Sequence, residues 1–208
     1  MAGPAKARGK RGMSAVVGPT TRPGNTLARL EDKLGQHASD TAQIVFESCR
    51  VPADHLLGEE GQGLKIALSG LEGGRIGIGA QAIGMARSAF DAALAYAKDR
   101  VAFGKPIFEH QAVQFRLAEM ATRIEAARQL VHHAASLKDA GRPCLKEAAM
   151  GKLRASENAE RVRSGDPPIR AGYRYVNNSR VDPIHRAVPV PPTTPRPPTR
   201  HTTPPRPR

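Results

Sequence analysis

One stretch in the middle of the chain carries residue types that suit a large anionic ligand with a flat ring. From Arg100 to Met120 the sequence reads RVAFGKPIFEHQAVQFRLAEM and joins the end of one helical pattern to the start of another. Arg100 supplies a fork of donors, Phe103 a stacking surface and Gln111 an amide. Arg100 and Gln111 flank the Gly104–Pro106 turn, so we expect them to converge on one ligand. The alternative interpretation is an ordinary helical hairpin with a Pro-Gly turn.

This stretch resembles the signature of the acyl-CoA dehydrogenase family, R-x-x-F-G-x-P-I followed by E-H-Q. The residues that match it at fixed spacing are Arg100, Phe103, Gly104, Lys105, Pro106, Ile107, Glu109, His110 and Gln111. Upstream, the segments LGQHASDT and VPADHLLGEEGQG resemble the second half of the family's middle β-domain. The resemblance extends over about residues 10–188 and is to a short- or branched-chain-type member.

The resemblance implies a fold and a reaction. Family members have an N-terminal helical domain, a middle β-domain and a C-terminal four-helix bundle, and they assemble as homo-oligomers. FAD takes a hydride from the β-carbon of an acyl-CoA thioester, while a glutamate removes the weakly acidic α-proton. That proton transfer needs a positioned base and a polarised thioester carbonyl. The resemblance therefore implies FAD as cofactor, acyl-CoA as substrate and electron-transfer flavoprotein as partner.

The resemblance also assigns roles to individual residues. Arg100 matches the arginine that reaches the FAD phosphates across the dimer. Phe103 matches the phenylalanine beside the cofactor, and Gln111 the glutamine near its phosphate–adenosine end. Glu72 and Arg75 match an acidic residue and an arginine near the CoA chain. A solvated pair at i, i+3 on a helix is an equal alternative for these two residues.

The family's catalytic glutamate has no match in this sequence. Gly74 stands where one subgroup carries it, which excludes that subgroup, and the late Y-E-G-T motif of the others is absent. The family's Q-I-H-G-G-Y-G appears as PIRAGYR, with Pro168 in place of the flavin-binding glutamine. The resemblance stops after Val188. We therefore expect no catalytic residue, and a flavoprotein that is truncated and impaired.

Apolar spacing predicts a mainly α fold, a C-terminal helical bundle behind a partial β-domain. Helices are expected near 61–98, 109–140 and 144–163, because apolar residues there recur at spacings of 3 and 4. These residues are Ile83, Ala86, Phe90, Leu94 and Ala97, then Val113, Leu117, Met120, Ile124, Ala127, Val131 and Ala134, then Leu145, Ala149 and Leu153. Strand-like runs are expected at 13–17 and 43–46.

We expect three parts along the chain. Residues 1–60 form a partial middle β-domain with a basic N-terminal end, and residues 61–164 form the helical bundle. Residues 165–208 hold a degraded fourth helix and a Pro/Arg-rich tail, for which polyproline II or disorder is the default. A change of reading frame near codon 163 would explain the tail, and a genuine disordered extension is the alternative. Its Pro/Arg composition alone would also suit binding to SH3-like modules. Without the fourth helix, the apolar face of the second helix should be partly exposed.

The basic charge of the chain lies at its two ends. The formal net charge is +13, yet residues 1–30 hold six Lys/Arg without an acid, and residues 165–208 hold eight Arg with two acids. The centre is nearly neutral, which argues against nucleic acid or a membrane surface as partner. No apolar run reaches the ~18–20 residues that span a membrane. Cys49 and Cys144 are far apart in the sequence, so we expect both to be reduced thiols and expect no metal site. We also expect a cytoplasmic protein.

Two hypotheses of different classes remain. The first is an FAD-dependent acyl-CoA dehydrogenase, impaired in the chain as written. The second is a non-catalytic helical module that only associates with itself or with full-length relatives.

Overall fold

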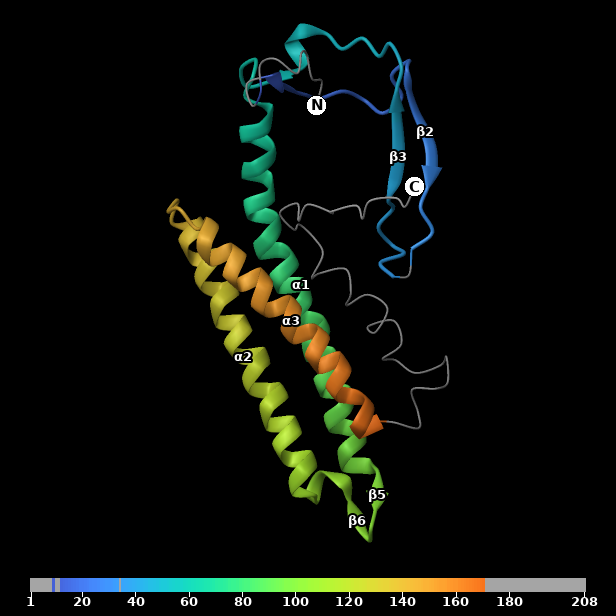
Figure 1. Ribbon diagram of the computed structural model, residues 1–208, viewed down its shortest axis with the longest axis vertical. Helices are drawn as coiled ribbons and strands as arrows, with labels where there is room; N and C mark the ends of the chain where they lie inside the picture. The colour runs from blue at the N-terminus through green and yellow to red at the C-terminus, as the bar shows by residue number, and fades with distance from the viewer. Residues whose placement is uncertain (1–8, 10–11, 34, 171–208) are drawn as a thin grey trace, which may run out of the picture. The chain divides into compact units, whose positions relative to one another are not determined.

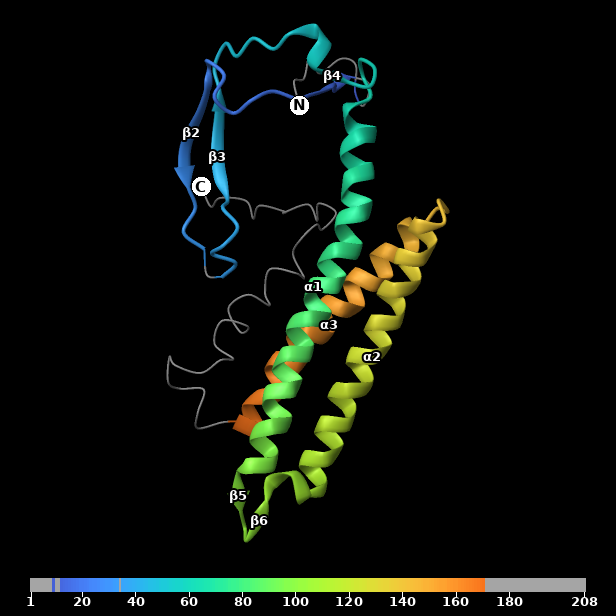
Figure 2. The ribbon, with the colours of Figure 1, turned by 180° about the vertical axis from the view of Figure 1, so that it is seen from behind.

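The computed structural model describes residue 9 and residues 12–33 and 35–170, with side chains as far as Arg161. The chain divides into two compact units, Met1–Gly73 and Gly74–Arg208. Strand pairs characterise the first unit and long helices the second (Figures 1 and 2). Of the degraded helix and tail predicted for residues 165–208, residues 171–208 lie outside the described residues.

The first unit contains two short antiparallel strand pairs. β1 (Ala15–Val16) pairs with β4 (Leu56–Leu57), and β2 (Asn25–Leu30) pairs with β3 (Ala42–Phe46). A short 3-10 helix, Ala53–His55, precedes β4. The apolar runs correctly indicated β1 and β3. β2 was not predicted, because its NTLARL segment is exposed along most of its length and mixes polar with apolar residues.

The first turn of helix α1 (Gly63–Asp99) lies against the segment that leads into β1. The backbone N–H of Gly63 donates to the Met13 carbonyl at 2.8 Å, and the N–H of Gly61 donates to Ser14 Oγ at 3.0 Å. A Cβ on Gly63 would lie 2.6 Å from the Ser14 carbonyl carbon. Glycine is therefore needed where α1 begins.

The second unit is built from the rest of α1, α2 (Gln111–Asp139) and α3 (Leu145–Arg170). A small hairpin of β5 (Val101–Ala102) and β6 (Lys105–Pro106), with the 3-10 turn Ile107–Glu109, connects α1 to α2. The predicted mainly helical fold is confirmed. α3 runs beyond its predicted end at 163 to Arg170, even though Pro167 and Pro168 each lack the N–H that a helix interior uses.

The buried faces of α1 and α2 follow the predicted 3-4 spacing. Both faces contribute to one hydrophobic cluster. The expected exposure of the apolar face of α2 is limited to the partly buried Val113, since the face from Leu117 to Val131 is buried. The largest side chains in this cluster come from α2, whereas α1 supplies mainly alanines. The cluster comprises Ala82, Ile83, Ala86, Ala89, Ala93, Ala97, Leu117, Met120, Ile124, Ala127, Val131, Ala155 and Ala159.

The predicted apolar face of α3 does not face this core. Leu145 and Leu153 are 55% and 59% exposed, while Ala148 and Ala155 are buried. Gly151 is buried against α2, where its Cβ would lie 3.2 Å from Val131 Cγ2. Small residues therefore mark the buried face of α3, because they permit close approach of the helices.

Asn158 on α3 is a buried amide whose hydrogen bonds are missing among the described residues. It is 3% exposed, and neither its Oδ1 nor its Nδ2 has a partner. We expect Asn158→Ala to raise the free energy of unfolding by about 1–2 kcal/mol, since an unsatisfied buried group is costly and alanine favours the helix. Urea unfolding followed by circular dichroism measures this change. The exposed Glu157→Ala is the control, and a destabilised Asn158→Ala protein would show that the amide is satisfied in solution.

Candidate functional site

The β5–β6 hairpin presents Phe103 in an unusual conformation. The hairpin has a two-residue loop, Phe103–Gly104, between the paired residues Ala102 and Lys105. Both loop residues have positive φ angles, 54° and 80°, as in the type I′ turn that suits such hairpins. Glycine adopts this conformation freely, but a left-handed φ costs a phenylalanine about 1–2 kcal/mol. The ring is 97% exposed, so packing within the protomer does not compensate.

Several hydrogen bonds attach the hairpin to the helices on either side. The N–H of Ile107 donates to the Arg100 carbonyl at 2.8 Å, which closes the base of the hairpin. His110 Nε2 lies 3.1 Å from the Ala102 carbonyl oxygen, and its ring meets Phe103 edge-on at 6.1 Å. Lys105 Nζ donates to the Glu109 carbonyl at 3.2 Å. These bonds give the loop a fixed place at one end of the bundle (Figure 1).

The three residues predicted for the cofactor lie together at this end. Arg100 directly follows α1, Phe103 lies at the hairpin tip and Gln111 is the first residue of α2. All three are exposed. Within the described part of the chain, no ion pair engages Arg100 and no side-chain hydrogen bond engages Gln111. Their donors are therefore available to a ligand.

The two residues predicted for the substrate lie elsewhere. Glu72 and Arg75 are half-buried residues of the early part of α1. Arg75 precedes the end of the helix at Asp99 by about 36 Å, taking 1.5 Å of rise per residue. Within one protomer, Arg75 is therefore far from the hairpin.

The hairpin residues suit a dinucleotide cofactor such as FAD. A guanidinium binds a phosphate through two parallel bonds, and an exposed ring offers a surface for a flat heterocycle. The N-terminus of the 29-residue helix α2 adds backbone N–H groups and a positive dipole end beside them. The chemistry of these donors thus fits an anionic, partly aromatic ligand.

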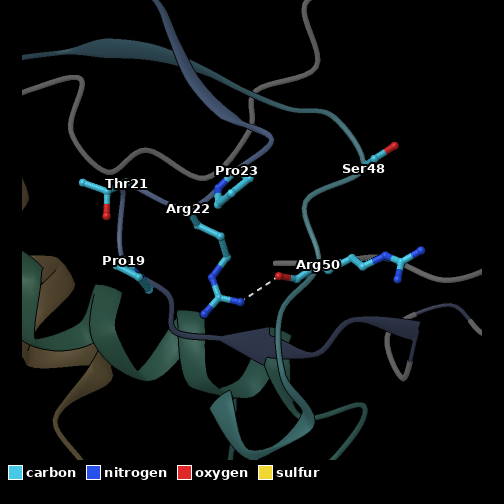
Figure 3. A pocket seen from close by; sticks show the side chains of 6 residues that line it. All are labelled: Pro19, Thr21, Arg22, Pro23, Ser48 and Arg50. Carbon is cyan, nitrogen blue, oxygen red and sulfur yellow. Dashed lines mark hydrogen bonds between the residues drawn. The ribbon is translucent and has the colours of Figure 1, made fainter.

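The first unit contains a cavity of about 460 Å³ that the sequence did not predict. Its lining residues are Pro19, Thr21, Arg22, Pro23, Ser48 and Arg50. Arg22 Nη1 donates to the Arg50 carbonyl at 2.7 Å, but the side chains of Arg50 and Ser48 point away from Arg22 (Figure 3). Because these polar groups do not converge on one point, the cavity is not a prepared anion site.

The fold and the hairpin define the class of protein. The family model described as "Acyl-CoA dehydrogenase, C-terminal domain" matches residues 61–193. The chain belongs to the acyl-CoA dehydrogenase family.

Particular relatives support this assignment. The chain is 48% identical over 179 residues to acryloyl-CoA reductase (NADH) of Anaerotignum propionicum, covering 86% of this chain and 45% of that protein. It is 49% identical over 166 residues to human mitochondrial short-chain specific acyl-CoA dehydrogenase, covering 80% of this chain and 40% of that protein. The solved structure of butyryl-CoA dehydrogenase from Megasphaera elsdenii has 43% identity and a TM-score of 0.89, covering 91% of this chain and 50% of that one.

The chain thus spans about half the length of the relatives it matches. The predicted family and fold are confirmed, whereas the roles of Arg100, Phe103, Gln111, Glu72 and Arg75 stay predictions. Among the described residues, no three His, Cys, Asp or Glu side chains gather as a metal site would require. The described helices also include none with the length and hydropathy to cross a membrane.

His110 was not predicted to have a role of its own, although its contacts connect the hairpin to the N-terminal end of α2. One feature could have indicated such a role: a histidine occupies the N-cap position of α2, where Ser, Thr, Asp or Asn is preferred.

Proposed function

We propose that the chain is part of an FAD-dependent dehydrogenase that introduces an α,β double bond into a short acyl-CoA thioester. Membership of the family and the names of the relatives, which include short-chain specific enzymes, support this activity. Electron-transfer flavoprotein is the proposed electron acceptor, and one similar solved structure concerns that protein of Acidaminococcus fermentans. FAD, when bound, supplies the hydride acceptor.

One observation supports the proposed division of roles within the chain. The exposed hairpin with Arg100 and Phe103 lies about 36 Å from Arg75 along α1, at 1.5 Å of rise per residue. A site that holds one flavin does not need contacts from both Arg75 and the hairpin of the same protomer. We infer that Arg75, with Glu72, serves the acyl-CoA site of its own protomer. The hairpin reaches the cofactor of a second copy in a homo-oligomer.

Each hairpin residue has a distinct task in this proposal. Arg100 donates to the cofactor's phosphates, and the Phe103 ring packs beside the cofactor. Gln111 bonds near its phosphate–adenosine end. No residue of the chain matches the glutamate that abstracts the α-proton, so we propose that dehydrogenation of acyl-CoA by these 208 residues alone is impaired.

Equilibrium dialysis against FAD tests the cofactor role. We expect the chain to bind FAD weakly, because the hairpin supplies only one side of the site. Arg100→Ala should weaken this binding by roughly tenfold or more, the effect of losing a hydrogen bond to a charged group. Arg142→Ala is the matched control, since it removes the same charge from an exposed residue beyond the other end of α2.

Equal losses of affinity in the two variants would contradict a specific role for Arg100. Isolation of the chain as a yellow protein with stoichiometric flavin would contradict the expectation of weak binding.

The second candidate is a non-catalytic helical module that associates with itself or with full-length relatives. The exposed apolar residues of the second unit favour it, since such surfaces commonly mark protein contacts. They include Val101, Phe103, Phe115, Leu145, Met150 and Leu153. The dialysis experiment separates the candidates, because a module without a cofactor role gives no difference between Arg100→Ala and Arg142→Ala.

A further inference from the structure

The β5–β6 hairpin cannot maintain its conformation alone. It contains two residue pairs, Val101 with Pro106 and Ala102 with Lys105. Pro106 has no N–H to donate, and two-stranded hairpins are at best marginally stable in water. Phe103 adds the unfavourable left-handed φ of 54°. The conformation must therefore be imposed by groups outside the hairpin.

The side chain of His110, the N-cap of α2, reaches the hairpin strand before the tip. Its Nε2 lies 3.1 Å from the carbonyl oxygen of Ala102, the residue directly before Phe103. A carbonyl only accepts, so Nε2 carries the hydrogen. That requirement is met both by the Nε2–H tautomer and by the imidazolium. The ring also meets Phe103 at an interplanar angle of 85°, a favourable edge-on arrangement. One side chain thus bonds to the backbone of the strained segment and lies beside its exposed ring.

The position of His110 in the helix supports a role beyond helix stability. His110 is the N-cap of α2, and its carbonyl accepts from the N–H groups of Val113 and Gln114 at 2.9 and 3.0 Å. Its side chain makes no capping bond. A Ser or Asp would cap the helix better, by typically about 1 kcal/mol over a non-capping residue. His110 therefore departs from the usual N-cap preference at a position where its side chain makes a different contact. Departures of this kind are typical of functional positions.

We propose that His110 is a positioning residue for the flavin site. Its bond to Ala102 and its contact with Phe103 hold the hairpin in the conformation that presents Arg100 and Phe103 to the cofactor. This inference rests on the proposed function of the hairpin, which concerns Arg100, Phe103 and Gln111 and assigns nothing to His110.

The test compares His110→Ala with His110→Gln in the full 208-residue chain. Glutamine places an N–H donor at the same number of bonds from Cβ as histidine Nε2, and neither substitute caps α2. Hydrogen exchange of the backbone amides of residues 101–105 and of Ile107 reports on the hairpin, and thermal unfolding reports on the bundle. His133→Ala, at an exposed position within α2, is the control.

We expect exchange in the hairpin to accelerate roughly fivefold in His110→Ala, the factor for one typical hydrogen bond. His110→Gln should restore most of the protection, and the melting temperature of the bundle should stay near that of His133→Ala. FAD affinity should follow the same order, with His110→Ala weakest. Unchanged exchange in His110→Ala would overturn the proposal, as would a His110→Gln protein that exchanges as fast as His110→Ala.

The exchange measurement needs no flavin, so it decides whether His110 holds the hairpin even when dialysis detects no FAD binding. If no FAD binds but the hairpin amides are protected from exchange in a way that depends on His110, the result would count against the proposed function alone. Altered exchange in His110→Ala without any difference in FAD affinity from His133→Ala would count against positioning for the cofactor.

Discussion

Ala155→Leu is expected to destabilise the bundle strongly, whereas Leu153→Ala should have almost no effect. Ala155 is 0% exposed within the hydrophobic cluster, while Leu153 is 59% exposed on the same helix. Adding three carbons to a close-packed site typically costs about 1–3 kcal/mol, and more when rigid helices must separate. Surface substitutions usually stay within about 0.5 kcal/mol. Urea unfolding of the two variants, compared with the parent chain, measures both changes.

The pair is informative because hydrophobicity alone predicts the opposite order. If large apolar residues formed the core of α3, Leu153→Ala would be the damaging change. A strongly destabilised Leu153→Ala protein, with a tolerated Ala155→Leu, would mean that the face carrying Leu145 and Leu153 is buried in solution. Concentration-dependent stability of the parent chain would then indicate burial by a second copy.

α1 and α2 could be predicted well from the sequence because periodicity reports directly on burial in a helix. The spacing of Leu117, Met120, Ile124 and Val131 correctly identified the buried face of α2. On α3 the same reasoning chose the wrong face. Close helix approach there depends on Ala148, Gly151 and Ala155, whose small side chains give little hydrophobic signal. Hydrophobic spacing therefore finds a core built from large residues and misses one built from small ones.

The candidate site was predicted in its residue types but not in its geometry. Arg100, Phe103 and Gln111 were proposed from their types and their spacing around a turn, and their roles stay predictions. The positive φ of Phe103 was not foreseen, because a phenylalanine seldom adopts it and the Gly104 that follows suggested an ordinary turn. The contact between His110 and Ala102 spans eight residues and depends on the angle at which α2 begins. Such an angle is set by tertiary packing, which local patterns do not encode.

A close contact between α1 and α2 leads to the second large effect, expected for Gly79→Ala. A Cβ at Gly79 would lie 2.9 Å from Val131 Cγ2 and 3.6 Å from the Cα of Lys152. The Cγ2 methyl of Val131 cannot simply rotate away, since a valine in a helix strongly prefers one rotamer. We expect a net loss of about 1–2 kcal/mol in the free energy of unfolding, despite the gain of ~1 kcal/mol in helix propensity.

Gly84→Ala is the matched control on the same helix, because a Cβ there meets nothing within 4 Å. It should stabilise the protein by up to about 1 kcal/mol, which is the propensity term alone. A double-mutant cycle with Val131→Ala isolates the clash: once the valine methyl is removed, Gly79→Ala should become neutral or stabilising, with a coupling energy of about 1–3 kcal/mol. If Gly79→Ala instead matched Gly84→Ala in the parent background, α1 and α2 would be farther apart in solution than the packing of Gly79 on Val131 requires.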